Sequence, residues 1–194
     1  MKRNLLAVFA AVLIPILACA QGSEWQIDPA HTNVAFTVRH LGISNVHGHF
    51  TKLTGTAIID DNDITKSSVN VSIDTASIDT GVQMRDNDLR SPNYFDAQKF
   101  PSITFKSTSV SKAGEGKLNV VGDLTIHGVT KQVTLNLDGP SAPVKMGPNM
   151  RRGLSAITTI NRKDFGVGSA PSSAAVGEQI KIDIDAELTQ KAAQ

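Results

Sequence analysis

The sequence predicts an all-β protein, either a sandwich or a barrel, from three observations. Several segments alternate strictly between apolar and polar residues, which is typical of strands with one dry face and one wet face. The alternation is clearest over residues 69–74, 132–137 and 180–188, and it is less regular over 103–106 and 154–160. Only one stretch favours a helix, and no repeat has the period of a solenoid or propeller. We therefore expect about eight strands in a single domain.

The first twenty residues have the pattern of a signal peptide. Lys2 and Arg3 give a positive start, and the apolar run that follows is too short to remain in a bilayer. We expect a signal peptide at residues 1–20 and one exported domain at residues 21–194. Cys19, the only cysteine, leaves a second option, in which a lipobox-like segment is cut before it and the cysteine is acylated. The residue two places earlier fits a lipobox poorly, so we favour soluble export.

One hairpin can be predicted with its register. If His127 and Gly128 form a two-residue turn, Ile126 faces Val129 and Leu124 faces Lys131. The pattern continues back to residue 118 and sorts apolar residues onto one face, with Lys131 as the exception. A slip of one residue would scramble this sorting, so the register is well specified.

The helical stretch lies at residues 79–101, and Ser91-Pro92 should end the helix near Arg90. Met84 and Leu89 are its expected apolar contacts. Two segments rich in Gly, Pro and Ser, residues 139–153 and 168–177, are predicted to be irregular loops.

Four of the five histidines lie between residues 31 and 50. Strand parity places His40 on the inner face, and it places His31, His47 and His49 outside. If residues 41–45 form the connection, His40 should lie opposite Val46.

The histidines do not predict a metal or catalytic site. His47 and His49 could chelate a metal weakly, but a third ligand is missing. The segment from Asp28 to His31 suits a turn, and no nucleophile has a base beside it in the sequence. The formal net charge is only +1, and the sequence has no basic stripe of the kind that binds nucleic acid. We predict no catalytic residue, no metal ligand and no nucleic-acid partner.

Four segments resemble the YceI-like family in their order and spacing: residues 25–56, 69–108, 122–135 and 159–168. The resemblance implies a single eight-stranded antiparallel lipocalin-like β-barrel with a short helical insertion, exported to the periplasm. It also implies a polyisoprenoid, such as an isoprenoid quinone or a polyprenyl lipid, bound non-covalently in the barrel, without an enzymatic activity. The chain departs from the pattern at His47 and His49, where many members carry Arg or Lys.

Strand parity supplies the candidate site. Inward-facing apolar residues are expected to line the lumen and contact the lipid. These are Val34, Phe36, Val38, Val46, Phe50, Val71, Ile73, Ile103, Phe105, Leu124, Val133, Leu135, Ile182 and Ile184. Four polar residues are candidates for a ligand's head group: His40, Lys131, Arg151 and Arg152. Alternatively, Lys131 snorkels to water at the rim and the two arginines are solvated loop charges.

The function predicted from these residues is a periplasmic carrier or sequestering protein, with transient contact with the membrane surface as a further option. Three alternatives stay open. The chain could be a secreted enzyme acting on such a lipid. It could be a surface metal or pH sensor built on His47 and His49. It could also be a filled barrel that acts as a ligand-free interaction module in a stress response.

Overall fold

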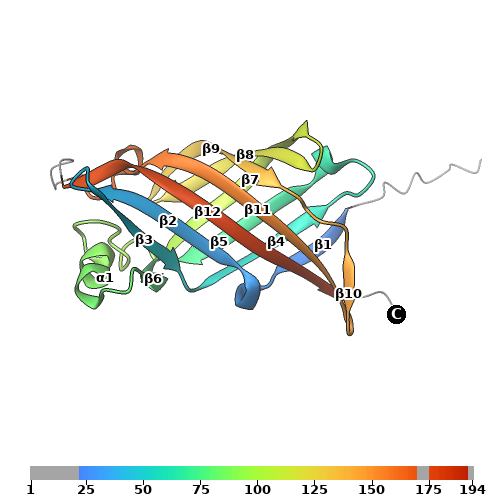
Figure 1. The fold of residues 1–194 in the computed structure, drawn as a ribbon, viewed down its shortest axis with the longest axis horizontal. Coiled ribbons are helices and arrows are strands. Elements are labelled where there is room, and N and C mark those ends of the chain that lie inside the picture. Colours follow the sequence, from blue (N-terminus) through green and yellow to red (C-terminus); the bar gives the residue numbers. More distant parts are fainter. Residues whose placement is uncertain (1–21, 170–174, 192–194) are drawn as a thin grey trace, which may run out of the picture.

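The computed structural model describes residues 22–169 and 175–191, so the predicted signal peptide and Cys19 lie outside the described residues. All strands join one antiparallel sheet that closes on itself (Figure 1). The strands are β1 Ser23–Ile27, β2 Asn33–His40, β3 Ser44–Phe50, β4 Leu53–Ile59, β5 Ser68–Asp74, β6 Ile78–Asp79, β7 Ser102–Gly114, β8 Lys117–Ile126, β9 Val129–Asp138, β10 Val144–Met146, β11 Asn149–Asn161 and β12 Val176–Lys191. The helices are α1 Gln83–Arg90 and four 3-10 turns, η1 Pro29–His31, η2 Ile64–Lys66, η3 Thr75–Ser77 and η4 Arg162–Phe165.

The sheet forms a closed eight-stranded barrel, which confirms the predicted fold class. Two positions in the barrel wall are each occupied by two consecutive strands. β1 and β2 lie end to end along β12, and β4 pairs with β1 while β3 pairs with β2. On its other edge β12 pairs with β11 over the whole of β11, from Asn149 to Asn161. Figure 1 shows α1 at one end of the barrel and β10 at the opposite end. We call these the α1 end and the β10 end.

The hairpin of β8 and β9 has the predicted register. Ile126 pairs with Val129 and Leu124 pairs with Lys131. His127 and Gly128 have φ values of 52° and 76°, which is the positive-φ pair that a two-residue hairpin turn requires. The His127 ring packs edge-on against Phe100, with centroids 4.5 Å apart.

The predicted register of the β2–β3 hairpin is wrong by two residues. His40 pairs with Ser44, and Val46 pairs with Val38. The connection is therefore residues 41–43 alone, and it turns through positive φ at Leu41 and Gly42.

Two local predictions also need correction. Met84 does not contact the core, because its side chain is 83% exposed, whereas Leu89 on the opposite side of α1 packs against the core as expected. Residues 139–153 do not form an irregular loop, because β10 and the start of β11 pair as a hairpin there. Part of the second predicted loop, residues 170–174, lies outside the described residues.

The ring is closed unevenly between β9 and β11. These strands pair at only three positions, from Ser155 opposite Asp138 to Ile157 opposite Asn136. Beyond that point β9 continues back to Val129 and β11 continues to Asn161 without pairing to each other. We call this junction the seam. No helix among the described residues has the length and apolar character needed to cross a membrane.

Candidate ligand-binding cavity

The inside of the barrel is hollow rather than packed solid. Inward residues of β8, such as Val120 and Leu124, are buried, as a packed core requires. Inward residues in the middle of other strands, such as Val34, Val133 and Ile182, keep partial exposure. They face a cavity of about 200 Å³ that lies inside the barrel.

All but one of the fourteen predicted lumen residues line this cavity. These are Val34, Phe36, Val38, Phe50, Val71, Ile73, Ile103, Phe105, Leu124, Val133, Leu135, Ile182 and Ile184. Val46 is the exception: it has the expected parity but is half-buried beside Val38 near the end of the β2–β3 hairpin, away from the cavity wall.

A second chamber of about 120 Å³ continues the lumen toward the β10 end. The two chambers have a set of apolar residues in common, which we call the waist. The waist consists of Ile27, Val71, Phe105, Leu135, Ile184 and Ala186. The lumen is therefore elongated, with two apolar chambers in series, a shape suited to a chain rather than to a compact ligand.

Aromatic residues close the first chamber at the α1 end. Tyr94 and Phe95, from the segment after α1, line the cavity together with Leu89. Phe95 packs edge-on against Phe50 at 6.1 Å, and Phe50 lies 6.0 Å from Phe36, measured between ring centroids. The sequence prediction missed Tyr94 and Phe95. Their signal was an apolar pair in the otherwise polar insertion.

A buried arginine also borders the first chamber and was not predicted. Arg162 is 4% exposed, and its guanidinium donates to four backbone carbonyls, at residues 167, 168, 176 and 177. Its parity is that of Ala156 and Ile160, so extending the strand pattern by two residues would have found it. These hydrogen bonds tie η4 to the start of β12 and fix the wall of the cavity.

At the β10 end, an arginine is stacked on a tryptophan next to the second chamber. Arg152 is 6% exposed, lies 4.9 Å from the Trp25 ring and donates to Asp61 at 2.7 Å. Trp25 packs with Leu188 and Ile59, which border the second chamber. Arg152 was a candidate for a head-group contact and also for a solvated loop charge. It is neither, because it lies within β11 and is already stacked and ion-paired.

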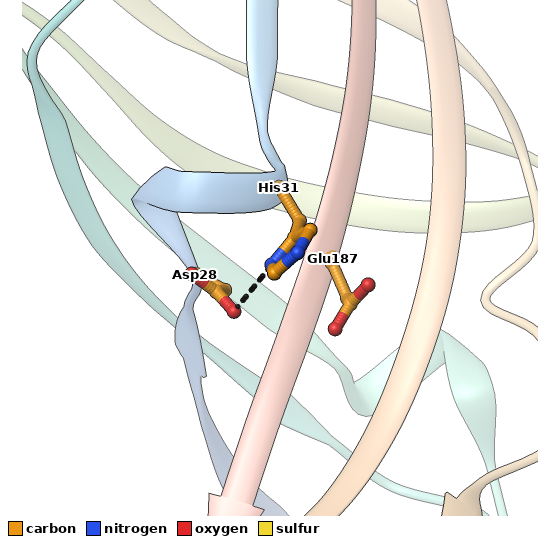
Figure 2. A group of neighbouring side chains, drawn as sticks. All are labelled: Asp28, His31 and Glu187. Atoms are coloured by element: carbon orange, nitrogen blue, oxygen red, sulfur yellow. Dashed lines mark hydrogen bonds and ion pairs between the residues drawn. The ribbon is translucent and has the colours of Figure 1, made fainter.

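Arg151 is likewise committed to partners within the protein. Its Nη1 donates to Asp28 Oδ2 at 2.9 Å and to Glu187 Oε1. His31 approaches the same Asp28 oxygen at 2.9 Å, and Figure 2 shows Asp28, His31 and Glu187 converging. The hydrogen bond from His31 is the largest of several that hold the pKa of Asp28 below its usual 3.8.

This cluster has the geometry of a metal site but not its electrostatics. Asp28, His31 and Glu187 form the only group of three metal-ligating side chains found within residues 22–169 and 175–191. Arg151 places a positive charge against both carboxylates, so a metal ion would first have to displace it. The cluster therefore links η1, β11 and β12 through ion pairs.

The remaining predicted polar residues are exposed to solvent. His40 does not turn into the lumen: it is exposed at the end of β2, where its neighbour across the sheet is Val176. Lys131 is exposed beside the seam. His47 and His49 are exposed as expected, and His47 Nδ1 lies 3.0 Å from Thr37 Oγ1.

Comparisons with known proteins agree with this architecture. A UPF0312 protein of Vibrio cholerae is 37% identical over 185 residues, covering 94% of this chain and 98% of the relative. BcnA of Burkholderia cenocepacia superposes with a TM-score of 0.74 at 26% identity, over 83% of this chain and 98% of BcnA. A polyisoprenoid binding domain from Saccharophagus degradans has the same fold, with a TM-score of 0.63 at 17% identity, over 87% of this chain and 98% of that domain.

The model of the YceI-like domain matches residues 25–188, the span from Trp25 in β1 to Leu188 in β12. The residues at the two ends of that span, Trp25 and Leu188, pack together, and Leu188 borders the second chamber. The match thus takes in both chambers, and the chain belongs to the YceI-like family.

Proposed function

We propose that this protein is an exported carrier or sequestering protein that holds a polyisoprenoid, or a similar long apolar chain, in its lumen without transforming it. The observation that carries the proposal is the pair of apolar chambers joined end to end through the waist. The polyisoprenoid-binding domain of Saccharophagus degradans, which has this fold, supports the choice of ligand. The predicted signal peptide at residues 1–20 supports export to the periplasm.

The energetics favour a chain of several isoprene units over a short one. Each buried CH₂ contributes roughly 0.8 kcal/mol, so a five-carbon isoprene unit contributes about 4 kcal/mol at most. Association costs about 4–15 kcal/mol in lost freedom. Stable binding without strong polar contacts thus needs several buried units, and this requires a ligand that extends through the waist.

Native mass spectrometry of the protein purified from its own host tests the proposal. We expect an added mass of several hundred daltons. The added mass should be absent from Ala186→Phe, which fills the waist, and present in Asp185→Phe, whose side chain points outward from the same strand. A repeatedly ligand-free spectrum, together with no uptake of a long-chain isoprenoid quinone, would refute the carrier function. Chemical conversion of a bound quinone or prenyl phosphate would instead support an enzyme.

Loading from a membrane has a candidate surface at the α1 end. Ile43 on the β2–β3 turn and Met84 at the start of α1 are 76% and 83% exposed, and both elements lie at this end (Figure 1). Such apolar tips can enter the interface of a bilayer. We expect the Ile43→Asp/Met84→Asp variant to take up an isoprenoid quinone from phospholipid vesicles more slowly. The control is Met146→Asp at the β10 end, where Met146 is 66% exposed. Equal uptake rates would argue against a membrane contact at the α1 end.

The mass of the mature N-terminus decides between the two leader hypotheses. Cleavage after residue 20 removes Cys19, whereas an acylated Cys19 would add the mass of its lipid.

A further inference from the structure

The seam opens into a cleft on the outer wall of the barrel. Where β9 and β11 stop pairing, they border a solvent-open cleft of about 610 Å³. One wall is β9 from Lys131 to Asn136, and the other is β11 from Ile157 to Asn161 with the end of η4, Asp164 and Phe165. The cleft is thus the place where the barrel wall lacks its normal ladder of hydrogen bonds.

The cleft and the lumen meet at this gap. Four residues border both of them: Val133, Thr158, Ile160 and Phe165. Val133, Thr158 and Ile160 have inward parity and Phe165 comes from η4; Val133 is half-buried and the other three are buried, so these side chains separate the lumen from the cleft. An apolar chain in the first chamber therefore lies directly behind a polar cleft.

Lys131 lies at this junction because of its register. It pairs with Leu124, which is buried and lines the lumen, so Lys131 occupies an inward position on β9. Its side chain is nevertheless exposed, since β9 has no neighbour on that side. No carboxylate in the described part of the chain lies within ion-pair distance of Lys131. By contrast, Lys181 across the cleft is paired with Asp183 at 2.7 Å.

The cleft also offers hydrogen-bond donors. Along the unpaired stretches of β9 and β11, alternate backbone N–H groups point toward the gap rather than toward a partner strand. Gln132, Thr134 and Asn136 line one wall, and Thr159 and Asn161 line the other. Of the three charged residues in the lining, Lys181 is paired with Asp183, Asp164 comes from η4, and Lys131 has no ion-pair partner among the described residues. The cleft therefore favours an anion that can accept several hydrogen bonds.

We propose that the cleft holds the anionic head group of a single-chain amphiphile whose tail lies in the lumen, and that Lys131 contacts this head group. The tail passes between Val133 and Ile160 into the first chamber. The shared chemistry is a phosphate or carboxylate on a long apolar chain. This inference rests on the proposed function, because it requires a chain-binding lumen.

The test compares probes that share one tail. Geranylgeranyl phosphate and geranylgeraniol differ only in the charged head, and geranylgeranoate replaces the phosphate by a carboxylate on the same carbon skeleton. We expect Lys131→Met to weaken binding of geranylgeranyl phosphate by about tenfold, the magnitude of one lost charge-assisted hydrogen bond. Its affinity for geranylgeraniol should not change, and Lys131→Arg should restore phosphate binding. A tenfold loss with geranylgeranoate as well extends the site to carboxylates, whereas a loss confined to the phosphate restricts it to prenyl phosphates.

Two control variants test whether the head group lies at the cleft. Lys106→Met removes an exposed lysine of β7 that does not border the cleft, and His40→Ala removes the polar residue at the α1 end. Both variants should bind all three probes as the parent does. Lys131→Met overturns the inference if it binds the phosphate normally, or if it loses the alcohol and the phosphate equally. Failure of the parent to bind any of the probes would instead refute the proposed function.

Discussion

Replacing Gly122 with alanine tests how tightly the wall of the lumen is packed. Gly122 lies on the inner face of β8, opposite Val133. A Cβ at this position would lie 2.5 Å from Cζ of Phe105 and 2.6 Å from the carbonyl oxygen of Lys106. The ring can swing only toward the lumen, since Phe105 is a waist residue, and the carbonyl cannot move without shifting β7.

Overpacking of this kind costs about 1–3 kcal/mol. For a domain of this size, each kcal/mol lowers Tm by about 2–4 °C, so Gly122→Ala should melt about 2–12 °C below the parent. Gly153→Ala is the matched control, because a Cβ there meets no atom within 4 Å and its φ is ordinary. It should be neutral or stabilising by up to about 1 kcal/mol. Thermal unfolding followed by circular dichroism, with both proteins freed of lipid, measures the difference. Equal melting temperatures for the two variants would refute the packing described for Phe105.

Three further predictions concern local structure. His127→Asn should leave thermal stability nearly unchanged, whereas His127→Val should lower it by about 1–2 kcal/mol, because β-branched residues resist the φ of 52° at this turn; equal urea midpoints would contradict this. Arg162→Leu should cost at least about 3 kcal/mol, since four backbone carbonyls lose their donor; a midpoint within error of the parent's would show that water replaces the guanidinium. Because hydrogen bonds hold the pKa of Asp28 below 3.8, its carboxylate stabilises the fold above pH 3.8 and loses that effect as the pH falls through the folded value. Asp28→Asn should therefore flatten the loss of stability in acid, measured by urea unfolding at successive pH values, and an unchanged pH profile would contradict the described cluster.

Two hairpins show how far the sequence pattern specifies register. In β8–β9 the turn residues His127 and Gly128 fixed the pairing, because few residues other than this pair adopt positive φ readily. In β2–β3 the pattern allowed two answers, since a shift of two residues keeps every side chain on its own face. The correct one depended on Leu41, a bulky residue that adopts positive φ. A positive φ at a leucine cannot be predicted from the residue type.

The sequence did not predict which residues far apart in the chain would contact each other. Arg151 and Arg152 followed a segment rich in glycine and proline, so they looked like loop charges. Their partners, Asp28 and Trp25, come from the other end of the chain and meet them only when the barrel closes. The seam was unpredictable for the same reason, because the length of pairing between β9 and β11 depends on how all the strands tilt around the ring. Parity alone was sufficient for thirteen of the strand residues that line the lumen, but it did not predict Tyr94 and Phe95 from the segment after α1.

The stacked Trp25 and Arg152 lie at the β10 end of the lumen, where Trp25 packs with Leu188 and Ile59 of the second chamber. For the proposed ligand, whose head group lies at the seam, the distance from this pair to the seam would set how much of the chain can be sheltered. The proposed function therefore predicts that affinity depends on chain length. Homologous chains of increasing length should gain affinity with each added unit until the end of the chain reaches Trp25. Longer chains should gain nothing more, because their extra units would remain in water.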